Sequence, residues 1–307
     1  MEHRLEKIDH CQICRGADIK DFISVIDHNY SGDVFNISEC VSCGYRFTNP
    51  RPIESTIGNY YKSENYISHN STKKGLINKI YHLVRNYQFK IKESSIEKTK
   101  ISPGKKVLDV GCGTGNFVNH LNLHGWNAEG VETDEKAREI AQLSNIKVYK
   151  NISLVDSEKY DVITMWHVLE HVYNLNDYMQ KLRSLLKKDG LLVIGVPNSN
   201  SYDANIYKEN WYAYDAPIHV SHFRKSNMKL LAEKNKFKHT KTQKLFFDAF
   251  YISMLSSKKS SKSILLGFLI GLISNAKAKK DGEYSSLIYY LFKYLLKRLL
   301  NLNGVLT

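Results

Sequence analysis

The sequence predicts an α/β protein built around a doubly wound, largely parallel sheet, with a small cysteine-rich domain on its N-terminal side. Short apolar runs that suit buried parallel strands alternate with helical patterns from residue 101 onward. One of these runs leads into a glycine-rich turn, and four cysteines before it fall into two C-x-x-C pairs. With 307 residues, of which 42% are hydrophobic, the chain can bury one large core and a small accessory one.

The cysteine pairs have the sequences CQIC and CVSC. Each C-x-x-C can place two thiolates on one turn, and two such turns close a tetrahedral site of four sulfurs that suits Zn²⁺. We therefore predict a closed, structural zinc site in a zinc-ribbon-like domain at residues 1–55. A redox C-x-x-C lacks a βαβ context here, and a disulfide does not suit a reducing compartment. The predicted ligands are Cys11, Cys14, Cys40 and Cys43.

The stretch VLDVGCGTGNF, Val107–Phe117, predicts a buried strand, a tight turn and the start of a helix. Its three glycines let the turn reverse sharply and let a ligand approach the backbone. Asp109 places a carboxylate at the end of this strand, and Glu132 ends the next strand, where a carboxylate can accept two ribose hydroxyls. The alternatives are a purely structural turn and a dinucleotide site, although the latter more often has the spacing G-x-G-x-x-G.

These features resemble the class I S-adenosylmethionine-dependent methyltransferases. In that family the D-x-G-x-G-x-G motif lies under the methionine half of the cofactor, and an acidic residue after the second strand binds the ribose. The resemblance implies a Rossmann-like, seven-stranded methyltransferase sheet and S-adenosyl-L-methionine as the cofactor. In a doubly wound sheet the carboxyl ends of these strands should surround one crevice. The expected cofactor-binding residues are Asp109, Gly111, Cys112, Gly113, Gly115, Glu132, Thr133, Asn151, Ile152, Trp166, His167 and His171.

The run WHVLEHV, Trp166–Val172, resembles the segment after the fourth strand of small-molecule methyltransferases. The sequence contains no proline-rich N/D-P-P-Y turn of the DNA-type amino-methyltransferases, so DNA is not an expected acceptor. His167 and His171 would share one face of a helix, as in the H-E-x-x-H metal motif. Glu170 is one residue late for that motif, so we interpret these side chains as lining the methionine end of the cofactor.

A loop rich in Trp, Tyr and His follows the fifth expected strand. Its P-x-H-x-x-H-F pattern, Pro217–Phe223, resembles methyltransferases of sugar-modifying and cell-surface polysaccharide pathways, several of which also carry an N-terminal zinc domain. A neutral imidazole suits proton removal from a hydroxyl, so we expect His219 to be the general base. His222 and Tyr214 are further catalytic candidates and Asp215 is a rival base. Packing against the following helix is the alternative for both histidines.

Residues 56–100 are expected to form a lid and a linking helix between the two domains. The tyrosine-rich stretch Asn59–Asn70 is either an exposed connector or a lid that keeps water from the methyl group. The lid candidates are Tyr60, Tyr61 and Tyr66. Apolar residues at helical spacing predict a helix over Leu76–Lys98.

The methyltransferase domain is expected to span residues 101–307, with an insertion around residues 255–285 on the acceptor side. Within it the apolar run Ile264–Ile273 is too short to cross a bilayer, so it forms either a buried helix or an interfacial segment. Lysines flank this run, and the formal net charge is +13. This arrangement favours a membrane surface or a phosphate-bearing substrate over a nucleic-acid duplex. The stretch KHTKTQKLFFDAFYISML before it is expected to be an outer strand and its extension.

Together these observations predict methyl transfer to a hydroxyl, or alternatively a carbon, of a sugar or another small metabolite. The substrate would belong to surface polysaccharide or nucleotide-sugar modification, in phosphorylated or lipid-linked form. No apolar run follows the charged start MEHRLEKIDH, so we expect a cytoplasmic protein, either free or peripheral at the inner membrane surface. An RNA-binding methyltransferase and a catalytically silent zinc-bearing scaffold are the two alternatives, and the oligomeric state stays open.

Overall fold

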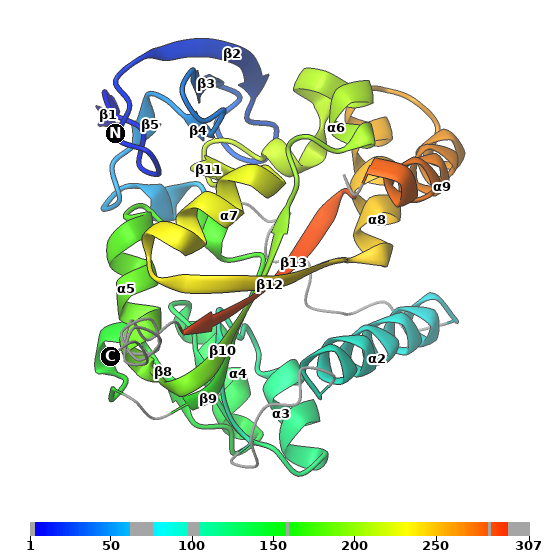
Figure 1. Cartoon of the computed structure of the whole chain (residues 1–307). Coiled ribbons are helices and arrows are strands. Elements are labelled where there is room, and N and C mark those ends of the chain that lie inside the picture. The colour runs from blue at the N-terminus through cyan, green and yellow to red at the C-terminus, as the bar shows by residue number, and fades with distance from the viewer. Residues whose placement is uncertain (1–3, 62–75, 98–104, 158–159, 282–283, 294–307) are drawn as a thin grey trace, which may run out of the picture.

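The computed structural model describes residues 4–61, 76–97, 105–157, 160–281 and 284–293 (Figure 1). A seven-stranded sheet dominates it, with strand order β12-β13-β10-β9-β6-β7-β8. Its strands are β6 (Lys106–Val110), β7 (Asn127–Val131), β8 (Val148–Tyr149), β9 (Tyr160–Trp166), β10 (Leu186–Pro197), β12 (Phe237–Lys244) and β13 (Ser286–Lys293).

The topology of this sheet is that of a doubly wound fold. Strands β6 to β10 are parallel, and from the β8 edge they run in the order third, second, first, fourth and fifth. β13 lies between β10 and β12 and runs antiparallel to both. The chain reverses its winding direction between β6 and β9, and ligands of such sheets bind beyond the carboxyl ends of the strands at that point. The predicted α/β fold is therefore confirmed.

Helices cover both faces of the sheet, because successive side chains of a buried strand point to opposite sides. Val107, Val162 and Val193 belong to one apolar cluster, which also contains side chains of α2 and α3. Leu108 and Ile163 belong to a second cluster, which contains side chains of α5 and α7. The helices of the domain are α2 (Leu76–Glu97), α3 (Asn116–Leu123), α4 (Glu135–Leu143), α5 (Leu175–Leu185), α6 (Tyr202–Tyr207), α7 (Lys225–Lys234), α8 (Phe246–Lys259) and α9 (Ile264–Asp281).

The N-terminal segment forms an antiparallel sheet of β2 (Ile19–Ile26), β3 (Val34–Cys40) and β4 (Arg46–Thr48). A fourth strand, β11 (Ser221–His222), comes from the loop that contains the pattern Pro217–Phe223, which we name the acceptor loop, and it pairs with β4. β1 (Leu5–Glu6) pairs with β5 (Arg51–Pro52) beside this sheet. The acceptor loop is therefore built into the N-terminal sheet. The domain boundaries expected at residues 55 and 100 stay a prediction.

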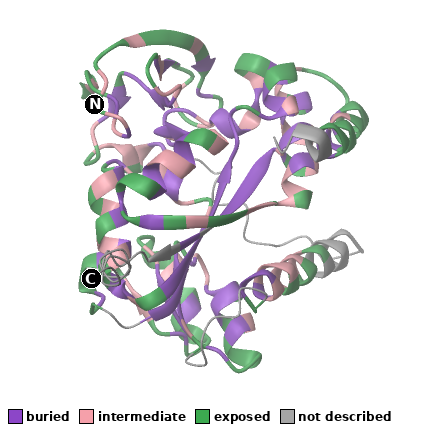
Figure 2. Ribbon diagram, viewed as in Figure 1, coloured by how far each residue is buried: buried purple, intermediate pink, exposed green. Residues whose placement is uncertain are grey.

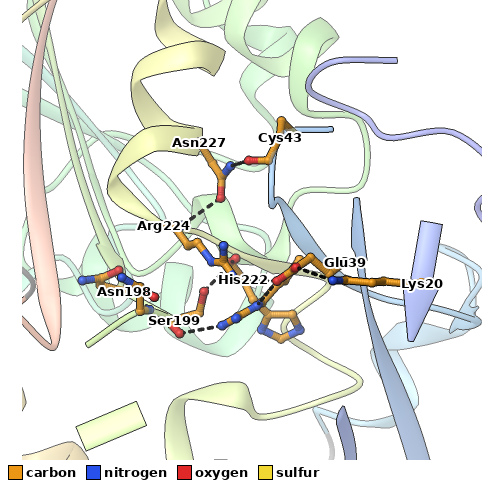
Figure 3. Close-up of polar contacts among 10 residues, drawn as sticks. Lys20, Glu39, Cys43, Asn198, Ser199, His222, Arg224 and Asn227 are labelled. Carbon is orange, nitrogen blue, oxygen red and sulfur yellow. Dashed lines mark hydrogen bonds and ion pairs between the residues drawn. The ribbon is translucent and has the colours of Figure 1, made fainter. Parts of the chain in front are cut away.

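A polar network ties the N-terminal sheet to the acceptor loop and α7 (Figure 3). Glu39 accepts a hydrogen bond from Arg46 Nε at 2.9 Å and is also bonded by Arg224. Burial alone would raise the pKa of Glu39, but the two guanidinium groups outweigh it and lower the pKa. The side chain of Asn227 donates to the carbonyl of Cys43 at 2.8 Å. These contacts fix the loop against the cysteine-rich segment.

Two stretches differ from the secondary structure that the sequence predicts. The pattern LNDYMQKLRSLLKKDG predicts a helix from Leu175 to Gly190, but α5 ends at Leu185, because Leu186 already pairs with Tyr160 in the sheet. The expected extension of the outer strand is instead α8, whose buried residues Ala249, Ile252, Ser253, Ser256 and Ser257 recur at helical spacing.

α9 follows α8 and packs against it (Figure 1). It is not a buried helix, since most of its large apolar side chains are exposed. Among the described residues, no helix combines the length and apolar character needed to cross a membrane.

Candidate functional site

The glycine turn lies at the carboxyl end of β6, as the sequence predicts. Gly111, Gly113 and Gly115 have φ angles of 72°, 54° and 75°, a left-handed conformation that favours glycine. A side chain added at Gly115 would meet Ile146 Cδ1 at 2.5 Å, so the absence of a side chain here lets the start of α3 pack closely against Ile146. A side chain added at Gly113 would meet no atom within 4 Å. The turn therefore presents bare backbone to open space at the edge of the sheet where a ligand is expected.

Two carboxylates border this turn. Asp109 is buried and accepts a hydrogen bond from Thr164 Oγ1 at 2.5 Å, while burial raises its pKa to about 6. Glu132 follows β7, and its Oε2 accepts from the backbone N–H of Gly113 at 2.8 Å. The structure thus brings Asp109, Glu132 and the glycine turn together, in the arrangement that the sequence predicts.

The neighbouring predicted residues have structural contacts of their own. The carbonyl of Thr133 accepts from Arg138 Nη1 at 2.6 Å. Asn151 caps the short turn after β8 by accepting from the N–H of Ser153 at 2.9 Å, and Ile152 follows it. Cys112 is buried, and burial raises the pKa of its thiol, so it is a small packing residue with an inert sulfur.

A half-buried lysine near Asp109 was not found from the sequence. Lys92 comes from α2, and its Nζ lies 4.4 Å from the centroid of the Trp166 ring. Burial lowers the pKa of Lys92, while Asp109 and Asp248 act in the opposite direction. The indole Nε1 of Trp166 is buried and has no hydrogen-bond partner within the described part of the chain. A lysine on a helix carries no sequence signal, so only the packing of α2 reveals this cation.

The prediction that His167 and His171 share one helix face is wrong. The backbone turns at His167, whose φ is 58°, and only a short 3-10 turn (Leu169–His171) follows. The Nε2 of His167 lies 2.9 Å from Asp248 Oδ2, and its Nδ1 lies 3.4 Å from Glu170 Oε1. Burial alone would lower the pKa of His167, but these carboxylates outweigh it and raise the pKa to about 10. The two carboxylates therefore favour the protonated form of His167, whose side chain is 40% exposed.

His171 instead faces the acceptor loop. Its ring lies against the ring of His219, with centroids 4.7 Å apart. The Nδ1 of His171 lies 3.0 Å from the carbonyl oxygen of Ile218 and 2.9 Å from the hydroxyl of Tyr61. Burial and the nearby His219 lower the pKa of His171 to about 4. The structure thus joins Tyr61, His171 and His219 into one cluster of neutral hydrogen-bonding groups.

The remaining predicted residues lie elsewhere. His222 and Tyr214 are buried, their rings pack edge to face, and His222 Nε2 lies 3.1 Å from Thr48 Oγ1. This position favours packing between the loop and the N-terminal sheet over catalysis. Tyr60 is buried against Phe35. Tyr66 lies outside the described residues.

The four predicted zinc ligands form one cluster. The Sγ atoms of Cys11 and Cys43 are 3.6 Å apart, and those of Cys14 and Cys40 are 3.4 Å apart. These distances exclude disulfides, whose sulfurs are about 2.05 Å apart. All four ligand atoms lie within 4.8 Å of one another, which suits a single tetrahedral ion. The backbone N–H of Cys14 points to Cys11 Sγ at 3.4 Å, a contact that would favour a thiolate.

Comparison with known proteins agrees with this geometry. A family model described as a methyltransferase domain matches residues 84–242, more than half of the chain. The chain belongs to this methyltransferase family. The resemblance to the class I S-adenosylmethionine-dependent methyltransferases is therefore confirmed at the level of the family.

Curated relatives match a shorter part of this methyltransferase. A ubiquinone biosynthesis O-methyltransferase of Glaesserella parasuis serovar 5 (strain SH0165) is 35% identical over 116 residues, which are 33% of this chain and 49% of that protein. An (S)-tetrahydroprotoberberine N-methyltransferase of Eschscholzia californica is 28% identical over 131 residues, 38% of this chain and 37% of that protein. The chain thus spans about half or less of the length of these relatives.

Among solved structures, a magnesium protoporphyrin IX methyltransferase from Synechocystis PCC 6803 with bound SAH is similar in fold. The TM-score is 0.52 at 15% identity, and the match covers 78% of this chain and all of that one, 100%. This likeness concerns the fold alone.

Proposed function

We propose that this methyltransferase acts on a hydroxyl group and that His219 is its general base. The observation that carries the proposal is the hydrogen bond from His219 Nδ1 to the carbonyl oxygen of Ala213, at 2.8 Å. A carbonyl only accepts, so Nδ1 carries the proton and Nε2 keeps its lone pair, for which the described residues offer no hydrogen-bond donor. Burial lowers the pKa of His219 below its ordinary value, which keeps the ring neutral at pH 7. The side chain is therefore ready to take a proton.

Tyr61 and His171 are proposed to orient the acceptor beside His219. The hydroxyl of Tyr61 lies 2.9 Å from Nδ1 of His171, and the rings of His171 and His219 meet edge to face. These groups can donate to or accept from an acceptor with several hydroxyls without placing a net charge beside it. A metal ion held by Glu170, His171 and His219 is the alternative use of this cluster, since one ligand atom of each lies within 4.8 Å. Oε1 of Glu170 already lies 3.4 Å from Nδ1 of His167, and this ion pair favours the metal-free interpretation.

The cofactor residues proposed from the sequence fit the glycine turn. Glu132 is placed to bind the ribose, and the backbone around Gly113 borders the space that the cofactor would occupy. Lys92 is proposed as the cation for the carboxylate of the methionine half, since it lies near Asp109. When bound, S-adenosylmethionine supplies a methyl group already activated by a positive sulfur. The chain then has to align the acceptor, exclude water and remove one proton.

A sugar hydroxyl is the acceptor class that we propose. Support comes from the P-x-H-x-x-H-F pattern and from the neutral polar cluster around His219. None of the relatives named above is a sugar methyltransferase, and one is named for ubiquinone biosynthesis. The hydroxyl groups of ubiquinone precursors are therefore the second acceptor class to examine.

The test uses the full chain with S-adenosylmethionine labelled on the methyl group. The acceptors are nucleotide sugars, lipid-linked sugars, catechols and bulk RNA, each with and without added Mg²⁺. Label in a sugar ether that does not depend on Mg²⁺ supports the proposal. Label in a catechol ether would move the acceptor to the second class. Label in RNA, or transfer only with added Mg²⁺, would contradict the proposed mechanism.

We also propose that the cysteine cluster binds one structural Zn²⁺ and that residues 1–55 form a zinc-ribbon-like domain. The sulfur separations of 3.4 and 3.6 Å support this proposal, and a site closed by four thiolates leaves no position for a catalytic water. Metal analysis should find one zinc per chain. Cys14→Ser should lose it, whereas Cys112→Ser, a cysteine outside the cluster, should keep it. An iron-sulfur chromophore would refute the proposal.

A further inference from the structure

The outward face of α9 is unusual for a helix on a protein surface. Most of its large apolar side chains project away from the protein, each of these at least 40% exposed, and Figure 2 shows the helix largely in the colour of exposed residues. The outward residues are Ile264, Leu265, Leu266, Phe268, Leu269, Leu272 and Ile273. Contiguous exposed apolar patches of this kind mark interaction sites. On the adjoining helix α8, Phe246 and Tyr251 are also exposed.

The inward face of α9 consists mainly of small and polar residues, and Ile270 is the large apolar residue that packs against a neighbouring apolar cluster. A side chain added at Gly267 would come within 2.6 Å of Met254 Cα, and one added at Gly271 within 2.9 Å of Phe250 Cα, so the backbones of α8 and α9 nearly touch. One turn further on, Ser274 donates to the buried carboxylate of Asp203 at 2.9 Å. A surface helix usually turns its large apolar side chains toward the protein core. The inward contacts of α9 instead hold it with most of these side chains turned outward.

The charges around this face identify its partner. Lys258 and Lys262 are exposed at the turn between the two helices, and Lys277 lies near the far end of α9. No charged residue occurs between Ile264 and Ala276. An apolar face with lysines at its edges matches the boundary between acyl chains and anionic headgroups. A second copy of this chain would bring the same lysines and the same formal charge of +13 toward it, which opposes association.

We propose that α8 and α9 form a docking surface for an anionic phospholipid bilayer, with α9 lying in the interface. The ten residues Ile264–Ile273 would extend about 15 Å as a helix, which is half of the roughly 30 Å hydrocarbon thickness. The helix is therefore suited to lie in one leaflet. The other end of the hairpin reaches the candidate site, since Asp248 of α8 pairs with His167.

The experiment is vesicle flotation of the full chain. The vesicles contain phosphatidylcholine alone or an equal mixture with phosphatidylglycerol. The wild-type chain should float with the anionic vesicles, and raising the salt concentration should weaken this binding. Leu265→Glu with Leu269→Glu should reduce the bound fraction about tenfold or more, because two large apolar side chains are lost from the interface. Lys258→Glu with Lys262→Glu should reduce binding to anionic vesicles in particular.

The matched control is Leu123→Glu with Leu143→Glu, which alters two leucines that are 77% and 85% exposed on α3 and α4. This variant should float like the wild type. Cofactor binding is also measured for every variant, to show that each variant is folded. Equal loss in both leucine variants, or no flotation of the wild type, would overturn the proposal. A wild-type oligomer in light scattering that Leu265→Glu with Leu269→Glu dissociates, without vesicle binding, would assign the face to a second copy instead.

Discussion

Replacing His219 tests the proposed chemistry at one atom. His219→Ala removes the Nε2 lone pair and leaves the carbonyl of Ala213 without its 2.8 Å hydrogen bond. Loss of a general base lowers turnover by about 10²- to 10⁴-fold, which corresponds to about 3–5 kcal/mol of transition-state stabilisation. The unpaired carbonyl lowers the free energy of unfolding by about 1–3 kcal/mol, so the protein should remain folded. Cofactor affinity should not change, because the glycine turn and Glu132 do not contact this ring.

The pH dependence gives the same test a second readout. Only the neutral ring accepts a proton, and burial lowers the pKa of His219. The rate of the wild type should therefore be flat near pH 7 and fall only below about pH 6.5, the ordinary pKa of histidine. Single-turnover assays from pH 5 to 8 measure this profile, with His239→Ala as a control on the outer strand β12. The reasoning fails if His219→Ala retains turnover and its acid limb while Asp215→Asn loses both.

Two further predictions concern stability. Asp203 is fully buried and accepts hydrogen bonds from Trp211 Nε1 at 2.8 Å and Ser274 Oγ at 2.9 Å, so Asp203→Ala should lower the free energy of unfolding in urea by about 3–5 kcal/mol. A loss under about 1 kcal/mol would show that these donors find other partners. Cys11→Ser with Cys14→Ser should lower the melting temperature of the whole chain, because Cys11 belongs to the apolar cluster of the catalytic core. Unchanged melting of the catalytic domain would show that the two parts are independent.

The sequence predicted the parts of the site that depend on local structure. The glycine turn requires left-handed backbone at three positions, and this requirement is visible in the residues themselves. Glu132 follows a strand next to β6 in the sheet, so the order of the strands alone brings it to Gly113. The cysteine pairs are equally local, since each C-x-x-C defines one turn.

The parts that depend on tertiary packing could not be predicted in the same way. His167 and His171 were assigned to one helix face, but the chain forms no α-helix there, and the two rings contact different partners. Lys92 and Asp248 lie on helices whose position relative to the sheet sets their role. The position of Asp248 was also not predictable, because the sequence predicts an outer strand and its extension for this stretch and not the helix α8.

The same limit applies to the acceptor loop. The pattern of histidines predicts a functional loop, yet it does not show which ring packs against the N-terminal sheet and which lies beside His171. The pairing of β11 with β4 buries His222 and leaves His219 beside His171. A strand of two residues contributed to a distant sheet has no signal in the sequence.

Cofactor binding at the glycine turn is the central claim, and a matched pair of glycine variants tests it most directly. Gly113 and Gly125 have φ angles of 54° and 80°, and a side chain added at either meets no atom within 4 Å. Alanine therefore brings a similar left-handed strain of about 1–2 kcal/mol to both. Only Gly113 lies at the carboxyl edge of the sheet, because Gly125 precedes β7.

The measurement is titration calorimetry of both variants and the wild type with S-adenosylhomocysteine. The wild type and Gly125→Ala should bind with similar affinity, and Gly113→Ala should bind at least about tenfold more weakly, a difference of about 1.4 kcal/mol. Equal affinity in Gly113→Ala and Gly125→Ala, or no binding by the wild type, would contradict the assignment of the cofactor to this turn.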